Sequence, residues 1–509
     1  MSRVWKNIIF NITGQALIVG LGFVGTRLVF RQLGEESLGI LYFALAIYTV
    51  MTPLLDMGLS STLVREVASH MNTDPEYVSR LTRTSTLFYW TSYLVLAGAI
   101  WLGVPWLVSH WISIKVLDST LVVRALRVLA LSLLLMLPRS FYSNLLRGVQ
   151  RMEFNNLIDV GTTAVHQAGT VLVVMLGGGL VKIASCYLVT LLLSNVVYVV
   201  AAARFFPWRS LIPSFSGDVV LRNFSFTAHM AVFAVLAMIQ MESDKALISK
   251  FLPIGLVGFY GVAQTLVARV SRLPGAVNQA SYPNFSKLFH NGDRVGLLRG
   301  YRQLQDLVCY GLVPIFAAIV FASRPVFTYL LSSHAADVLF LPTVLLCLGW
   351  YMNGTLSTPF TLSLAVGRPD INAKQNLYAL FVVLPVTGVL IWKWGLVGAG
   401  LSSVFYHLFV YGYFARVCAR ECLGISPREW YFHVLRILGI AVATYGVTWI
   451  VLTLLTSKTS IIFLAIAYGL GSFVYLYAAN LAAGPELRAC LFNLRRSVSV
   501  AVIPYFSSN

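Results

Sequence analysis

Residues 338–367 have the sequence VLFLPTVLLCLGWYMNGTLSTPFTLSLAVG, and none of them is Asp, Glu, Lys or Arg. A helix needs about 20 mostly apolar residues to cross a bilayer, so this run is long enough for one crossing. A strand of a membrane β-barrel would instead alternate apolar and polar side chains over about 10 residues. The run therefore predicts a membrane-spanning helix.

Similar runs, with few or no charged residues, recur along the chain. They cover residues 8–30, 38–63, 84–109, 121–146, 157–178, 183–203, 223–246, 254–275, 304–323, 338–366, 376–392, 396–415, 434–455 and 460–482. We therefore expect an all-α polytopic membrane protein with about 14 transmembrane helices. The composition excludes a soluble enzyme, because only 11% of the 509 residues are charged against roughly 25% in soluble domains.

The net charge of +18 is mainly a signal of topology. With the amino terminus inside, the cytoplasmic segments hold 23 of the 37 Lys and Arg residues, the outer segments hold 7, and the spans hold 7. Cytoplasmic loops of membrane proteins carry such an excess of cations. We expect a multi-pass protein of the inner or plasma membrane with both termini in the cytoplasm, and no nucleic-acid partner, because no basic domain is present.

The outer loops are too short for most membrane-embedded enzymes. The longest, around residues 110–120, has about a dozen residues, which is little room to hold a sugar acceptor. The chain lacks the Gly-x-x-x-x-Gly-Lys loop that binds nucleotides. Cys418 and Cys422 share a helix face but have no nearby His partners. We expect no catalytic residues, no cofactor and no metal.

A weak internal repeat suggests how the spans are grouped. A shift of 219 residues places Leu33, Gly39 and Ala44 on Leu252, Gly258 and Ala263, and transporters are often built from such repeats. We expect a six-helix bundle over residues 1–205, a cytoplasmic linker over 206–222 and a second six-helix bundle over 223–416. Two further helices and a cytoplasmic tail then occupy residues 417–509.

Several segments of both halves resemble a known family. They are FRQLGEESLG at 30–39, LDMGLSSTLVREVA at 55–68, DKALISKFL at 244–252, VGFYGVA at 257–263 and YPNFSKL at 282–288. They are similar to polysaccharide repeat-unit (Wzx-type) flippases of the multidrug/oligosaccharidyl-lipid/polysaccharide exporter superfamily. The resemblance covers roughly residues 1–420. It implies two six-helix bundles around a central cavity, working by alternating access.

The substrate that the resemblance implies is a polyprenyl-diphosphate-linked oligosaccharide, carried from the cytoplasmic to the outer leaflet for cell-surface glycan synthesis. Membrane lipid and other polysaccharide assembly proteins are the further partners we expect. Each unpaired polar group in hydrocarbon costs about 2–7 kcal/mol, so a flippase needs a polar groove for the sugars and cations for the diphosphate.

Basic side chains within or at the ends of spans are the substrate-binding candidates. An Arg or Lys at the bilayer centre costs roughly 2.5–3.5 kcal/mol on insertion scales, which makes each one a functional hypothesis. The candidates are Arg27, Arg65, Arg124, Arg127, Arg139, Lys245, Arg269 and Arg272. We favour Arg27 and Arg269. For Arg65, Arg124, Arg139 and Arg272 the alternative is that the side chain reaches to lipid head groups near a span end.

Acidic side chains in the spans are candidates for binding a coupling proton or sodium ion. They are Asp56, Asp159, Glu242 and Asp244. Asp56 also fits a helix-breaking Asp-Met-Gly turn, and Asp244 also fits simple neutralisation of Lys245 or Arg27.

Other functions remain open from the sequence. The nearest are a lipid II-type flippase and a cation-coupled drug antiporter of the same superfamily, although a site for cationic drugs would favour acidic over basic spans. An integral-membrane glycosyltransferase or polymerase is a weaker alternative, with Glu242 and Asp244 as its acidic pair.

Overall fold

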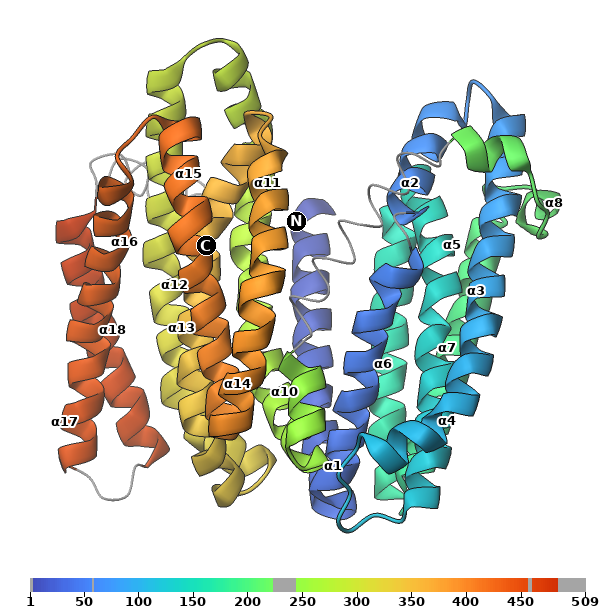
Figure 1. The fold of residues 1–509 in the computed structure, drawn as a ribbon, viewed down its shortest axis with the longest axis horizontal. Coiled ribbons are helices and arrows are strands. Elements are labelled where there is room, and N and C mark those ends of the chain that lie inside the picture. The colour runs from blue at the N-terminus through green and yellow to red at the C-terminus, as the bar shows by residue number, and fades with distance from the viewer. Residues whose placement is uncertain (1–2, 57–58, 223–243, 456–459, 484–509) are drawn as a thin grey trace, which may run out of the picture. The chain divides into compact units, whose positions relative to one another are not determined.

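The computed structural model describes residues 3–56, 59–222, 244–455 and 460–483 (Figure 1). Within these residues the secondary structure is helical and contains no strand. Ten of the described helices are long and apolar enough to cross a membrane. They correspond to eleven predicted spans, because the helix over Pro369–Leu423 contains two of them. The total of 14 stays a prediction, since most of the span predicted at 223–246 lies outside the described residues.

The chain divides into two compact units, one of residues 1–261 with 329–331 and the other of residues 262–328 with 332–509. The helices up to residue 222 are α1 (Arg3–Asp56), α2 (Leu59–His70), α3 (Pro75–His110), α4 (Ser119–Leu134), α5 (Met136–Gly148), α6 (Met152–Met175), α7 (Leu180–Ala202) and α8 (Trp208–Leu211). Residues 244–251 are also helical. The boundary between the units falls inside the next helix, α10 (Ile254–Ala268).

The remaining elements follow in chain order. They are η1 (Arg269–Ser271), α11 (Arg272–His290), α12 (Arg294–Leu330), α13 (Ser333–Ala365), α14 (Pro369–Val410), η2 (Tyr411–Ala415), α15 (Arg416–Cys418), η3 (Ala419–Leu423), α16 (Pro427–Ala441), η4 (Val442–Gly446), α17 (Val447–Leu455) and α18 (Ile461–Ala482). Figure 1 shows α16, α17 and α18 beside one another. The predicted boundaries at 205, 222 and 416 stay predictions.

Two long helices each contain a reversal that separates predicted spans. In α1, Gly34 has φ 83° and ψ 175°, a backbone conformation that is readily available only to glycine. It separates the spans predicted at 8–30 and 38–63. In α14, Gly395 has φ 56° and separates the spans predicted at 376–392 and 396–415.

The span predicted at 121–146 is broken into α4 and α5. Pro138 lacks an N–H, and its ring clashes with the carbonyl four residues earlier in a regular helix. The break accordingly falls at Leu135, just before Pro138. The break matters for the candidate site because it precedes Arg139.

Each unit has its own apolar core. In the first unit, Leu63, Tyr89 and Phe141 are among the buried residues that join α2, α3 and α5. In the second, Phe285 and Trp430 belong to a cluster that joins α11 and α16. Close packing of this kind holds the spanning helices at defined rotations, which decides which side chains meet.

Candidate substrate site

Arg27 lies in the first half of α1, seven residues before the reversal at Gly34. Its guanidinium carbon lies 3.6 Å from the centre of the Tyr329 ring, and both residues belong to the first unit. The positive charge over the ring face is a cation–π contact. A guanidinium carries N–H donors that can bond two phosphate oxygens at once.

Lys245 lies in the helix over residues 244–251 and is half-buried. Its backbone N–H donates to Asp244 Oδ1 at 2.7 Å, and the Tyr260 hydroxyl donates to Asp244 Oδ2 at 2.8 Å. The Asp244 carboxylate therefore connects this helix to α10. The hydrogen bonds to Lys245 and Tyr260 give Asp244 a structural role. Ion coupling by Asp244 stays a prediction.

Arg139 and Asp159, which the sequence put forward for two different roles, are paired. Arg139 donates to Asp159 at 2.6 Å and to the Ser194 hydroxyl at 2.9 Å. The Tyr198 hydroxyl donates to the same Asp159 oxygen at 2.7 Å. The Arg139 side chain is only 13% exposed and that of Asp159 is 46% exposed. Arg139 is thus held inside the bundle of α5, α6 and α7, and does not reach outward to lipid head groups.

Three other candidate cations lie at exposed or interhelical positions of the first unit. Arg127 donates through Nε to the Trp101 carbonyl at 3.0 Å and stacks on the Trp101 ring at 4.8 Å, so it ties α4 to α3. Arg124 is exposed on α4, and Arg65 is exposed on α2, where it pairs with Glu66 at 2.7 Å. Arg127 and Arg65 thus have structural partners, and their roles in substrate binding stay predictions.

Arg269 and Arg272 flank a change in helix type. Arg269 is exposed and begins η1, a short 3₁₀ segment, and Arg272 begins α11. Residues three apart in a 3₁₀ helix lie on the same face, so the predicted juxtaposition of these two backbone positions is compatible with the structure. The side chains of Arg272 and Asp56, and the whole of Glu242, lie outside the described residues.

Among the described residues, the sequence reasoning missed three buried carboxylates: Glu36, Asp306 and Glu66, which is 6% exposed and pairs with Arg65. Glu36 is 7% exposed, and its carboxylate accepts hydrogen bonds from three successive backbone N–H groups, those of Lys115, Val116 and Leu117, at 2.7–3.1 Å. Asp306 is 6% exposed and pairs with His433 at 3.0 Å. Asp306 could have been found from the sequence, because it is a lone acid at the start of an apolar run.

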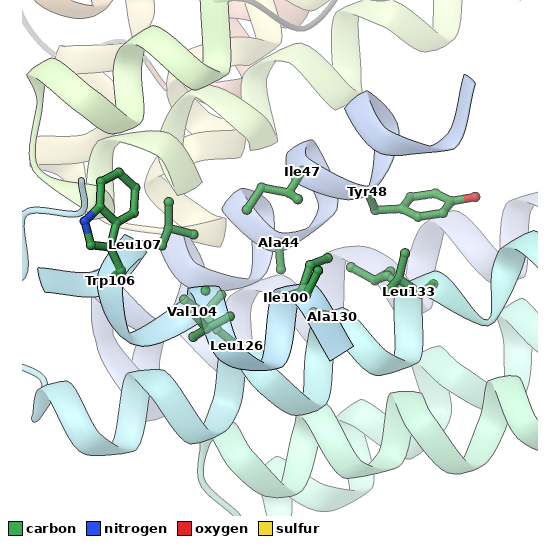
Figure 2. Close-up of a pocket in the computed structure, with 13 residues that line it drawn as sticks. Ala44, Ile47, Tyr48, Ile100, Val104, Trp106, Leu107, Leu126, Ala130 and Leu133 are labelled. Carbon is green, nitrogen blue, oxygen red and sulfur yellow. The ribbon is translucent and has the colours of Figure 1, made fainter. Parts of the chain in front are cut away.

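A cavity of about 280 Å³ lies between α1, α3 and α4. Figure 2 shows that its wall is formed by apolar side chains, Ile47, Ile100, Val104, Leu126 and Leu133 among them, with the Tyr48 hydroxyl as a rare polar group. Such a wall offers almost nothing to hydrogen-bond a sugar or a phosphate. The cavity suits hydrocarbon, so the polar part of a substrate must bind elsewhere.

In the part of the chain that the structure describes, no group of three or more His, Cys, Asp and Glu side chains is arranged to hold a metal ion. The basic candidates that the structure describes offer guanidinium and ammonium groups. Such groups can attract and orient an anion.

Comparison with protein families decides the assignment. Residues 4–289 match the family described as "Polysaccharide biosynthesis protein", which is more than half of the chain. The protein belongs to this family. The matched polysaccharide biosynthesis region contains all eight candidate cations, from Arg27 to Arg272.

Two bacterial proteins are similar over most of their length. One, from Shigella flexneri, is named as an O-antigen transporter and is 21% identical over 408 residues, which are 78% of this chain and 93% of the relative. The other is lipopolysaccharide biosynthesis protein WzxC of Escherichia coli (strain K12), 20% identical over 431 residues, 81% of this chain and 80% of WzxC.

The fold is also that of a known transporter. The lipid II flippase MurJ in an inward closed conformation superposes with a TM-score of 0.72 at 14% identity, over 93% of this chain and 98% of MurJ. The predicted all-α membrane fold and the resemblance to Wzx-type flippases are confirmed. This polysaccharide biosynthesis protein has a multi-pass helical membrane fold, which it shares with MurJ.

Proposed function

We propose that the protein is a flippase that moves a polyprenyl-diphosphate-linked oligosaccharide from the cytoplasmic to the outer leaflet by alternating access, for cell-surface polysaccharide synthesis. The family match and the names of the two relatives support this function over a lipid II-type flippase or a drug antiporter. The protein then resides in the inner or plasma membrane with both termini cytoplasmic, as the cation distribution indicates. Other polysaccharide assembly proteins would supply its substrate and take up its product.

The observation that supports the proposal is the Arg27 guanidinium held against Tyr329 in α1, within the span predicted at residues 8–30. A cation in the bilayer costs free energy, so its presence there indicates a function. The diphosphate is the anionic part of the proposed substrate, and a cation would bind it. Arg27, Lys245 and Arg269 are the diphosphate-binding residues in this proposal, and Tyr329 orients Arg27. The lipid tail stays in hydrocarbon while the sugars cross with the cationic groups.

Ion coupling belongs to the same proposal. Asp159 is the acid best placed for it, because its charge is balanced by Arg139 in the resting structure. Protonation of Asp159, or arrival of a phosphate at Arg139, would break that balance and change the packing of α5 against α6. Asp56, Glu242 and Asp244 remain further candidates for binding a coupling ion.

The test is a null strain scored for lipid-linked glycan accumulated in the cytoplasmic leaflet. We expect wild-type protein to clear the glycan, and Arg27→Ala and Arg269→Ala to leave it accumulated at normal protein abundance. Arg299→Ala is the control, because Arg299 is an exposed cation in the predicted cytoplasmic part of α12. A null strain with no accumulated glycan would refute the proposed function. Full complementation by both variants would refute only the proposed binding residues.

A further inference from the structure

A groove of about 520 Å³ lies within the second unit, between the two halves of α14 and the start of η2. Its lining is apolar and aromatic and consists of Tyr378, Phe381, Val382, Phe409, Gly412 and Tyr413. Phe381 is 71% exposed, so the groove is open to the surroundings of the unit. An empty apolar hollow forfeits dispersion contacts, and a hydrocarbon chain lying in it would recover them.

The groove is open because residue 412 is a glycine. η2 is a π-helical turn, a rare element that is frequent at functional sites. The Tyr431 hydroxyl donates to the Tyr411 carbonyl at 2.6 Å, and the hydroxyls of Tyr411 and Thr355 are hydrogen-bonded at 2.6 Å. These bonds fix the rotation of η2. Gly412 is exposed, and a Cβ added to it would meet nothing within 4 Å. A larger side chain at this position would therefore fill the groove without disturbing the core.

Two exposed cations, Lys374 and Arg416, lie at the same end of the groove. Lys374 comes one helical turn before Tyr378, and Arg416 comes three residues after Tyr413. The rings of Tyr378 and Tyr413 meet edge to face, with centroids 5.3 Å apart. Because the two halves of α14 run in opposite directions, the cations lie beyond the same side of this ring contact. The cation distribution predicts that this end is cytoplasmic.

The charge at this end of the groove is positive. Residues 368–374 and 416–421 together carry four cations and two acids. Both acids pair with Arg368, at 2.8 Å and 2.6 Å. Lys374 lies 3.9 Å from one of them, and Arg416 forms no ion pair within the described ranges. A guanidinium can bond two oxygens of one phosphate, so Arg416 with Lys374 suits a phosphate ester.

We propose that this groove binds an anionic phospholipid of the cytoplasmic leaflet. One acyl chain lies along Gly412 between the aromatic side chains, and Arg416 and Lys374 bind the phosphate. Basic pockets between membrane-spanning helices on the cytoplasmic side bind lipid head groups in this way. Ordinary interfacial aromatics and cations would lack the hollow. The occupant is a resident phospholipid and not the lipid proposed to be transported, because none of the eight substrate-binding candidates lies on α14 or η2.

The first test measures head-group selectivity and does not depend on the proposed function. Delipidated full-length protein in detergent is titrated with phosphatidylglycerol, and separately with phosphatidylcholine of the same acyl chains, and bound lipids are counted by native mass spectrometry. We expect one phosphatidylglycerol to bind at least tenfold more tightly than phosphatidylcholine. Lys374→Gln with Arg416→Gln should weaken phosphatidylglycerol binding threefold to tenfold and leave phosphatidylcholine unchanged. Lys393→Gln is the matched control, because Lys393 is exposed on α14 but lies 19 residues from Lys374.

The second test fills the groove. Gly412→Leu should weaken the binding of both phospholipids at least threefold, because the new side chain takes the place of the acyl chain. Gly439→Leu is the control, since Gly439 is also exposed in the second unit and has nothing within 4 Å of an added Cβ. The thermal midpoints of both variants without added lipid should equal that of the wild type, which shows that the fold is intact.

Three results would overturn the proposal. The first is equal affinity of the wild-type protein for the two phospholipids. The second is unchanged phosphatidylglycerol affinity in both the double variant and Gly412→Leu. The third is tighter binding of a long-chain polyprenyl phosphate than of phosphatidylglycerol, lost in Gly412→Leu, which would assign the groove to the transported lipid instead.

Discussion

The Arg139 guanidinium and the Asp159 carboxylate form an ion pair at 2.6 Å that joins α5 to α6. The pair also receives the Tyr198 hydroxyl and reaches Ser194. The guanidinium is mostly buried and the carboxylate is about half exposed. The pair is therefore intermediate between a solvent-exposed salt bridge and a fully buried one. Its charges cancel where an isolated charge would be costly.

Substitution of Arg139 and of Asp159 should each destabilise the protein, and the two effects on the free energy of unfolding should not be additive. In a double-mutant cycle with Arg139→Ala and Asp159→Ala, we expect a coupling energy of about 1 kcal/mol, near the upper end for exposed pairs because Asp159 is partly screened by solvent. The measurement is thermal unfolding in detergent. Glu153→Ala on the same helix is the control, since Glu153 and Arg151 are both more than half exposed. Equal effects of Glu153→Ala and Asp159→Ala would contradict the prediction.

Tyr329 should support Arg27 through its ring and not through its hydroxyl. We expect Tyr329→Phe to export glycan at close to the wild-type rate, and Tyr329→Leu to export about threefold to tenfold more slowly, as loss of a cation–π contact would give. Initial export rates at matched protein abundance are the readout. A slow Tyr329→Phe variant would point to the hydroxyl instead.

Asp118 caps the amino terminus of α4. Hydrogen bonds from the Thr120 hydroxyl and the Leu121 backbone N–H lower the pKa of the Asp118 carboxyl below its ordinary value. A lowered pKa in the folded state contributes stability above the unfolded-state pKa, near 3.9, and loses it as the pH falls through the folded-state pKa.

Asp118→Ala should therefore lower the thermal midpoint at pH 7 and pH 5, by about a degree or two, and the difference from wild type should vanish as the pH is lowered below about 4. Midpoints measured at pH 7, 5, 4 and 3 check this. Asp118→Asn retains a capping oxygen, so its effect at pH 7 should be smaller than that of Asp118→Ala, and it should also shrink as the pH falls below about 4 because Asn does not titrate. A difference for Asp118→Ala that persists unchanged at pH 3 would show that the capping charge is not responsible.

The predicted topology has a direct test. We expect Ser508→Cys, near the carboxyl terminus, to be protected from a membrane-impermeant thiol reagent in intact cells and labelled in inside-out vesicles. Gly179→Cys should show the opposite pattern, because Gly179 is exposed before α7 and has nothing within 4 Å of an added Cβ. The reverse result at both positions would invert the orientation inferred from the 23 cytoplasmic and 7 outer cations.

The sequence by itself determined the membrane class, most of the spans and the candidate cations. These properties depend only on consecutive residues. A span is a contiguous apolar run, and an Arg within it can be identified from the sequence whatever the orientation of the helix. The reversals at Gly34 and Gly395 fall between predicted spans for the same reason. The residues that resemble Wzx-type flippases are also local, so the family could be inferred before the structure was known.

Only the tertiary structure decided which side chains meet. Arg139 and Asp159 were separate candidates from the sequence, and nothing local connects Tyr329 to Arg27. Glu35 and Glu36 are adjacent and chemically alike, yet Glu35 is exposed and Glu36 is buried against the backbone of residues 115–117. The physical reason is that hydropathy averages over a whole helix, whereas a contact depends on the rotation of each helix and on loops folding back from distant positions. The internal repeat made Gly39 equivalent to Gly258, and helix packing brought the two glycines into contact.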